Sequence, residues 1–190
     1  PQAWNQGLKK STGEYLLVLN PDTRLPKDFF EVELSLLKSD PKIGVVGPKF
    51  VDTDGTPQGS VFPEPGILNT FFIKNKFTPD SLVPVEVNSI SGACLFFSKK
   101  TLDIIGPFTE EVFMYFEDMD FCRRLRHVGL KIIFDPRVSI IHGHGQSTTQ
   151  LRHAPFTLSI KINAEPAVQE ERAKARPLSD LNVELRGCAL

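Results

Sequence analysis

The chain has 190 residues, enough for one globular domain with a sizeable core and too few for two ordinary domains. Hydrophobic residues make up 41% of the sequence and charged residues 24%, proportions that exclude a disordered chain. The 22 basic and 23 acidic residues give a formal net charge of −1. This balance lacks the basic excess of a nucleic-acid-binding protein, so we expect no nucleic-acid partner.

Cysteine usage and the start of the chain bear on its compartment. The three cysteines, Cys94, Cys122 and Cys188, are far apart and odd in number, which argues against a disulfide framework and favours a reducing compartment. No stretch approaches the roughly 20 apolar residues that a membrane span needs. The sequence begins at Pro1 without the features of a signal peptide and reads like the middle of a longer protein. We therefore expect a cytoplasmic protein, represented here by a fragment.

Apolar patterning predicts alternating strands and helices, as in α/β proteins. The apolar run at residues 15–19 lacks polar alternation, which is typical of a strand that is buried on both faces of a sheet. The other expected elements are a helix at 26–39, a strand at 43–47, a hairpin turn at 52–55, a long irregular loop at 56–86, a strand at 85–97, helices at 99–105 and 117–128, and strands at 131–134 and 138–141. We place one domain at residues 1–150 and a peripheral or poorly ordered tail at residues 151–190.

Two acidic positions are candidates for chemistry. Asp22 directly follows the apolar run, and a carboxylate at the carboxyl end of a strand is well placed to hold a divalent cation on a diphosphate. An ordinary turn explains the same residue. Glu117, Asp118 and Asp120 open a predicted helix, where acids complement the helix dipole, but three acids within four residues exceed that need. This cluster is a candidate source of a general base.

Three further positions have a functional and a structural interpretation. His142 follows an apolar strand and precedes Gly143, so it is either a metal ligand or a loop histidine of no consequence. Gly92-Ala93 lies inside a predicted strand, which indicates the close approach of a ligand or of another part of the backbone. Asn5 either contacts a nucleotide or caps the short helix expected around residues 5–10.

Taken in order, these residues resemble glycosyltransferase family 2, and the closer likeness is to its bacterial rhamnosyltransferase-like branch. The likeness covers roughly residues 3–150, with its segments in the order of the family. They are Asn5 with Gly7, residues 13–23, Gly47-Pro48, Asp54-Gly55, Ser91-Gly92-Ala93, Gly106-Pro107-Phe108, residues 113–124 (Phe-Met-Tyr-Phe-Glu-Asp-Met-Asp-Phe-Cys-Arg-Arg), Gly129 with Lys131, Pro136, His142, and Gly145-Gln146-Ser147.

The resemblance implies a GT-A fold: a mixed α/β sheet flanked by helices, here without the first nucleotide-binding strands. On the donor side it implies that Asp22 and His142 hold a Mg²⁺ or Mn²⁺ ion on the diphosphate. Asn5 and Asn20 would contact the donor, with Asn20 standing where many relatives have an acid.

On the acceptor side the resemblance implies that Asp118 is the catalytic base, supported by Glu117. It places acceptor contacts at Gly92, Ala93 and Asp120. The implied activity is a metal-dependent, inverting transfer of a sugar from a nucleotide-diphosphate donor to a glycan or lipid-linked hydroxyl in cell-surface polysaccharide synthesis. The branch suggests dTDP-rhamnose as the donor, and the acceptor class suggests peripheral association with the inner face of the plasma membrane.

Two departures from the family pattern qualify this expectation. Thr109 replaces an acid that commonly follows the phenylalanine at this point, which affects an acceptor-side contact and leaves Asp118 in place. The base- and ribose-binding segment that precedes this region in the family is absent before Pro1, so we expect the fragment by itself to be inactive. The alternatives are a non-catalytic glycan- or partner-binding module on a GT-A scaffold and a metal-dependent nucleotidyltransferase, which explains Asp22 but not the acidic helix start.

Overall fold

The computed structural model describes residues 1–63, 77–111, 116–143, 156–160 and 186–187, and the structural statements below concern these residues. Several parts of the sequence-based expectation fall outside them. They include residues 64–76 of the expected long loop, the Phe113-Met114-Tyr115 segment, the Gly145-Gln146-Ser147 segment, most of the expected tail, and Cys188. Among the described residues, no helix is both long enough and apolar enough to cross a bilayer.

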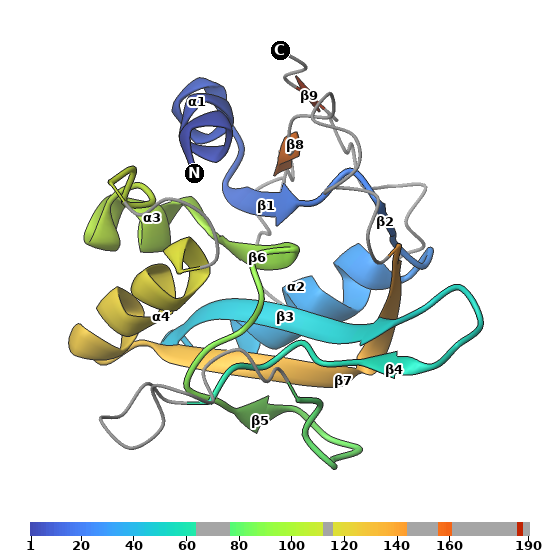
Figure 1. Cartoon of the computed structure of the whole chain (residues 1–190). Coiled ribbons are helices and arrows are strands. Elements are labelled where there is room, and N and C mark those ends of the chain that lie inside the picture. Colours follow the sequence, from blue (N-terminus) through green and yellow to red (C-terminus); the bar gives the residue numbers. More distant parts are fainter. Residues whose placement is uncertain (64–76, 112–115, 144–155, 161–185, 188–190) are drawn as a thin grey trace, which may run out of the picture.

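A nine-stranded mixed sheet forms the centre of the molecule (Figure 1). Its main path has the strand order β2-β7-β3-β6-β1-β8-β9, while β4 pairs with β3 and β5 pairs with β7. The strands are β1 Tyr15–Leu19, β2 Thr23–Arg24, β3 Ile43–Val51, β4 Pro57–Gln58, β5 Val85–Glu86, β6 Cys94–Ser98, β7 Lys131–His142, β8 Phe156–Ile160 and β9 Arg186–Gly187. The mixed α/β sheet expected from the sequence is therefore confirmed.

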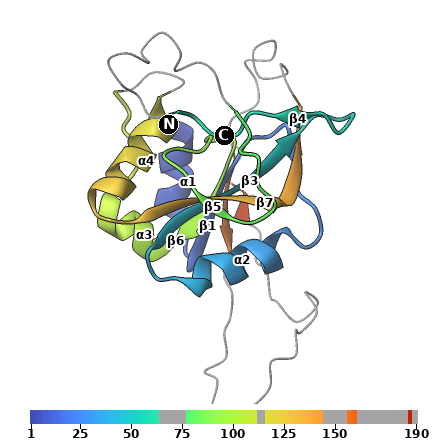
Figure 2. The same cartoon turned by 90° about the horizontal axis from the view of Figure 1, so that it is seen from below.

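Helices cover both faces of this sheet (Figures 1 and 2). The helices α1 (Gln2–Lys10), α3 (Lys99–Ile105) and α4 (Glu117–His127) lie on one face, and α2 (Phe29–Ser39) lies on the other. The side chains of β1 alternate between two cores: Leu16 and Val18 pack with α1, α3 and α4, whereas Tyr15 and Leu17 pack with α2. This alternation explains why the sequence of β1 is apolar at every position, as a strand buried on both faces requires.

The strand expected at residues 85–97 is divided in the structure. It comprises β5 and β6, and Gly92-Ala93 lies in a turn before β6 rather than in the centre of a strand. Conversely, Asp135-Pro136 does not interrupt β7, which pairs in parallel with β3 on both sides of it. A register shift opposite Pro48 and Lys49 accommodates the extra residues, as a β-bulge does.

Several other boundaries differ from expectation, and β3 for example continues to Val51 instead of ending at residue 47. Helix α2 begins at Phe29 instead of residue 26. Val128 was expected on the buried face of α4, but the helix ends at His127 and Val128 is 52% exposed. Residues 156–160, within the expected tail, form β8 and pair antiparallel with β1, so the sheet extends beyond residue 150.

Strand directions place several chain segments at one edge of the sheet. Strand β6 runs antiparallel to both β1 and β3, and β3 runs parallel to β7. The carboxyl ends of β1, β3 and β7 and the amino end of β6 therefore share this edge. Because ligands of open α/β sheets bind at the carboxyl ends of the parallel strands, this edge is the first place to look for a site.

Candidate active site

The segment between β1 and β2 brings Asp22 to His142. After β1 the chain crosses the edge of the sheet and pairs with the last residues of β7, with Thr23 opposite His142. The Gly143 N–H donates to the Asp22 carbonyl oxygen at 2.8 Å and fixes this approach. As a result His142 Nε2 lies 3.6 Å from Asp22 Oδ1, with the two side chains only 12% and 10% exposed.

This pair has the chemistry of a partial cation site. A carboxylate oxygen and an imidazole nitrogen suit divalent ions such as Mn²⁺, and nucleotide-bound ions take their remaining ligands from phosphate oxygens and water. Two ligands on one ion lie about 3 Å apart at right-angle coordination, close to the observed separation. Asp22 and His142 therefore fit a divalent cation, to which they would supply two of its ligands. Among the described residues, no group of three or more His, Cys, Asp or Glu side chains forms a complete metal site.

Asp118 lies at the start of α4 and reaches the turn before β6. Its Oδ2 accepts a hydrogen bond of 2.8 Å from the backbone N–H of Gly92, and its Oδ1 accepts one of 2.9 Å from the N–H of Met119. The side chain is buried, with the residue 7% exposed. These donors and the positive end of the helix dipole stabilise a negative charge on this carboxylate.

Gly92 is where the backbone must come close to other groups. A Cβ atom at this position would lie 2.7 Å from Cη2 of Trp4 and 3.3 Å from Cβ of Asp118. Only a glycine lets its N–H reach the Asp118 carboxylate beside the indole ring. The close approach expected from the sequence thus exists, but its described partners are Trp4 and Asp118. Ala93 packs in the core that faces α2, and a role of either residue in acceptor binding stays a prediction.

The donor-side and acceptor-side residues are neighbours along this edge. The N–H of Asn20 donates to the carbonyl oxygen of Ala93 at 2.9 Å, and the next residue, Gly92, donates to Asp118. Asn20 also begins the turn that carries Asp22, because its carbonyl oxygen accepts from the N–H and the hydroxyl of Thr23. One short run of hydrogen bonds therefore links the Asp22 turn to the start of α4.

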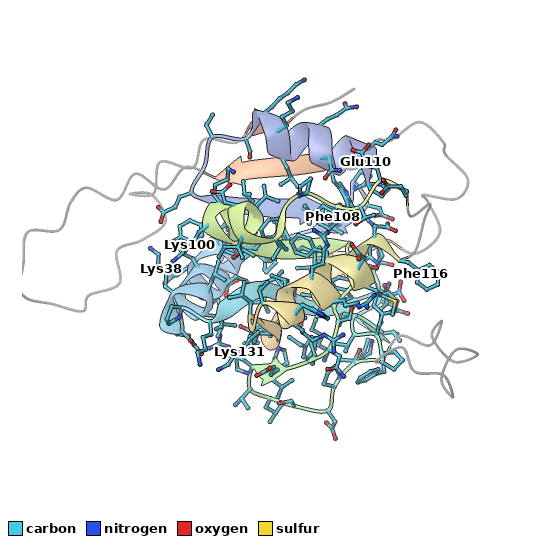
Figure 3. The ribbon with its side chains drawn as sticks, turned by 90° about the vertical axis from the view of Figure 1, so that its left-hand side faces the viewer. Lys38, Lys100, Phe108, Glu110, Phe116 and Lys131 are labelled. Atoms are coloured by element: carbon cyan, nitrogen blue, oxygen red, sulfur yellow. The ribbon has the colours of Figure 1, made fainter. Side chains whose placement is uncertain are left out.

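Asn5 makes its described side-chain hydrogen bonds within the protein, and the donor contact suggested by its position in the sequence stays a prediction. Its amide oxygen accepts from the N–H of Phe108 at 2.9 Å, and its Nδ2 donates to the Phe108 carbonyl at 2.8 Å and to Glu110 Oε1 at 2.9 Å. Figure 3 shows Phe108 between α1 and α4, with Glu110 beside α1. The amide is thus committed to the loop that leads towards α4, which supports a structural role and gives donor binding no support.

Asp120 is also held within the protein. Its Oδ2 accepts from the Thr109 hydroxyl at 2.6 Å and from Arg124 Nε at 2.9 Å, and Arg124 in turn donates to the carbonyl of Ile105. Thr109, the departure from the family pattern, thereby ties the loop to α4. Glu117 accepts from the N–H of Phe116 at 3.1 Å, as an acid in a first helical turn does.

Sequence reasoning missed two residues that shape this edge. Gln58, in β4, contacts both His142 and Asp52, and Trp4 covers Gly92. A lone glutamine after a hairpin turn and a lone tryptophan in a short helix carry no pattern that identifies them. Only the hairpin itself, with Gly55 at φ +86°, was predictable, and it is the hairpin that folds Gln58 back onto β3 and towards His142.

Comparisons with known proteins identify the family of this chain. Residues 1–105 match the family model described as glycosyl transferase family 2. The chain belongs to glycosyl transferase family 2. Among curated relatives of this family-2 chain, the N-acetylglucosaminyl-diphospho-decaprenol L-rhamnosyltransferase of Mycobacterium tuberculosis is 28% identical over 149 residues, which cover 71% of this chain and 48% of that protein.

Two more comparisons concern a second relative and the fold. The low-salt glycan biosynthesis hexosyltransferase of Haloferax volcanii is 28% identical over 157 residues, covering 77% of this chain and 49% of that protein. This family-2 chain therefore spans about half the length of the curated relatives it matches. The crystal structure of GalNAc-T7 with UDP, GalNAc and Mn²⁺ aligns with a TM-score of 0.56 at 14% identity, covering 75% of this chain and 30% of that one, which shows a GT-A fold.

Proposed function

We propose that the protein is an inverting glycosyltransferase in which the sheet edge described above binds donor and acceptor side by side. The observation that carries the proposal is the convergence of two different sites on one edge. An Asp22–His142 pair suited to a divalent cation lies one short hydrogen-bonded run from a buried carboxylate at a helix start. A non-catalytic module on the same scaffold would need neither the pair nor the carboxylate.

On the donor side, Asp22 and His142 would hold Mg²⁺ or Mn²⁺ on the diphosphate of a nucleotide sugar. Such an ion neutralises the charge that develops on the departing nucleotide diphosphate. Asn20, whose backbone shapes the Asp22 turn, would contribute a hydrogen bond to the donor instead of a charge. In this arrangement the protein fixes the Asp22 turn and positions the His142 imidazole. The hydrogen bond from Gly143 to Asp22 and the pairing of Thr23 with His142 serve this purpose.

On the acceptor side, Asp118 would act as the general base. The acceptor hydroxyl oxygen forms a bond to the anomeric carbon while its proton passes to the Asp118 carboxylate. The bond from the anomeric carbon to the diphosphate oxygen breaks, and its electron pair leaves with the nucleotide. A single displacement from the opposite face inverts the anomeric configuration. Glu117 at the start of the same helix would add negative charge that favours proton uptake.

For substrates, we propose rhamnose from dTDP-rhamnose as the donor sugar and a glycan or lipid-linked glycan as the acceptor. The support is the rhamnosyltransferase-like sequence pattern and the M. tuberculosis relative, whose name describes a rhamnosyl transfer to a decaprenol-linked acceptor. A reaction on a lipid-linked acceptor would take place in the cytoplasm at the inner face of the plasma membrane.

The direct test is to incubate the full-length protein that contains this chain with Mn²⁺, a lipid-linked glycan acceptor and a panel of nucleotide sugars that includes dTDP-rhamnose and UDP-hexoses. Release of the nucleoside diphosphate identifies the donor, and NMR of the transferred sugar gives its anomeric configuration. Turnover of one donor with inversion is the expected result. Retention of configuration, or tight glycan binding without turnover of any donor, would contradict the proposal, and the second outcome would favour the binding module.

A further inference from the structure

A chain of hydrogen bonds continues from His142 away from Asp22. Asp52 directly follows β3, and Gln58 lies in β4, which the hairpin folds back against β3. Gln58 Nε2 donates to Asp52 Oδ1 at 2.6 Å and to the His142 carbonyl oxygen at 2.7 Å, while Gln58 Oε1 lies 3.1 Å from His142 Nδ1. Gln58 is only 6% exposed, so these contacts are shielded from water.

The orientation of the Gln58 amide follows from its neighbours. A carboxylate and a backbone carbonyl can only accept hydrogen bonds, so the amide nitrogen must face Asp52 and the His142 carbonyl. The flipped amide would place its oxygen within about 2.7 Å of two other oxygens, which is strongly repulsive. The amide oxygen therefore faces the imidazole, and since this oxygen cannot donate, the proton of the contact must be on His142 Nδ1.

The tautomer of His142 determines whether Nε2, on the other side of the ring, carries a lone pair. A neutral imidazole with its proton on Nδ1 carries its lone pair on Nε2, the nitrogen that lies 3.6 Å from Asp22 Oδ1. We propose that Asp52 and Gln58 form a relay that fixes His142 as the Nδ1–H tautomer and presents Nε2 as a ligand to the divalent cation of the donor. Gln58 is then a positioning residue, and the inference rests on the metal site proposed above.

Packing around the ring supports this assignment. The Phe50 ring lies 5.4 Å from the imidazole, centroid to centroid, and limits its rotation. The pairing of β2 with β7 holds the His142 backbone on the same side as Asp22. Ring orientation and protonation are thus set by different neighbours, as is common for metal-binding histidines whose second nitrogen donates to the protein.

The first test uses the metal-free wild-type protein and needs no variant to fold. Long-range ¹H–¹⁵N NMR of the imidazoles, with the His142 signals assigned by their loss in His142→Gln, reports which ring nitrogen is protonated. At a pH where the ring is neutral, we expect a protonated Nδ1 and an unprotonated Nε2. A predominant Nε2–H tautomer would overturn the inference.

The second test measures Mn²⁺ affinity by electron paramagnetic resonance of the free ion. Gln58→Met keeps the length of the side chain and removes the amide, and we expect Mn²⁺ to bind about 10- to 100-fold more weakly, the usual effect of losing such an outer partner. Asp52→Ala should weaken it too, whereas Asp52→Asn keeps an oxygen acceptor for Gln58 and should restore most of the affinity. Asp54→Ala is the matched control, since it removes an exposed carboxylate of the same turn that lies outside the relay and should leave the affinity unchanged.

The outcomes separate this inference from the proposed function. If Mn²⁺ binds equally well to the wild type and to His142→Gln, the metal site fails and the ligand role of Nε2 fails with it. If binding depends on His142 but folded Gln58→Met binds like the wild type, the metal site stands and the relay is wrong. Equal weakening by Asp54→Ala and Asp52→Ala would also overturn the relay, because it would show an effect of turn charge alone.

Discussion

Two buried carboxylates on opposite faces of the sheet differ in how the fold treats them. Asp118 on α4 receives hydrogen bonds from Gly92 and Met119 at the edge where the candidate active site lies. Glu33 on α2 is 0% exposed, and neither of its carboxylate oxygens has a hydrogen-bond partner among the described residues. Both are acids inside a helix-covered sheet, but only one is provided with donors that stabilise its charge.

The electrostatics of Glu33 follow from this environment. Burial, and to a lesser extent the negative charge of Asp135, raises the pKa of Glu33 to about 8, while the Arg137 guanidinium acts in the opposite direction. Arg137 is already engaged by Asp135 in a bidentate ion pair. Glu33 is therefore neutral at pH 7 in the folded protein. The comparison teaches that burial alone yields a neutral acid, whereas a carboxylate that must act as a base needs N–H donors.

The largest expected effect is on catalysis by the full-length protein that contains this chain, and the kinetic predictions below refer to that protein. Asp118→Asn keeps an oxygen that accepts from Gly92 and removes the base, so turnover should fall by about 10²–10⁴-fold. Steady-state kinetics measures this, with thermal unfolding as a check that the variant is folded. Glu33→Gln is the matched control on the other face of the sheet, and its turnover should equal that of the wild type. Similar losses in both variants would remove the distinction between the two acids.

The next effect is on stability and concerns Glu33. Because the folded-state pKa of Glu33 is raised to about 8 from its ordinary value of 4.5, the free energy of unfolding should decrease as pH rises from about 4.5 to 8. Glu33→Gln cannot ionise, so it should lose this pH dependence and exceed the wild type by roughly 2–4 kcal/mol at pH 7–8. Urea unfolding at pH 5, 6, 7 and 8 measures the difference. Parallel pH profiles for the two proteins would show that Glu33 is already ionised in the fold.

Gly92→Ala tests what holds Asp118 in place. The added Cβ would come within 2.7 Å of the Trp4 ring, which should cost about 1–3 kcal/mol and shift the N–H that binds Asp118. Gly44→Ala is a control of similar crowding, because its Cβ would lie 2.8 Å from the Leu125 side chain. Gly44 lies at the amino end of β3, away from the candidate active site. Both variants should lose stability, but only Gly92→Ala should lower kcat per folded molecule. Equal kcat values would mean that the Gly92 contact does not position the base.

Asn5→Ala should have the smallest effect of the four. It removes the amide that holds the Phe108 backbone and Glu110, and we expect a loss of about 1–2 kcal/mol of stability with a modest decrease in kcat. Gln2→Ala on the exposed side of the same helix is the control and should change neither quantity. An increase in the KM for the donor, with stability unchanged, would restore the donor contact expected from the sequence.

The sequence predicted the parts of the fold that depend on local patterns. The continuous apolar run of β1, the helix α3 with its following glycine, and the buried face of α4 were all evident from periodicity and terminators. Local patterns selected Asp22 and His142 separately, only the family resemblance joined them in one metal site, and the structure brings them together through the pairing of β2 with β7.

What the sequence did not predict depends on contacts between distant segments. The hydrogen-bond partners of Asn5 lie in a loop more than 100 residues away, and Gln58 contacts a histidine 84 residues later. The Asp135-Pro136 pair looked like a break between strands, but parallel pairing with β3 carries β7 across it. Glu33 lies on the buried side of α2, where periodicity alone would have placed an apolar residue.

The most direct test of the central claim compares donor binding with turnover in two variants. Dissociation constants for the Mn²⁺-dependent binding of the nucleoside diphosphate should be unchanged in Asp118→Asn and raised in Asp22→Ala, while turnover should be lost in both. This pattern would establish one sheet edge with separate donor and acceptor carboxylates. Unchanged turnover in Asp118→Asn, or unchanged Mn²⁺-dependent binding in Asp22→Ala, would contradict it.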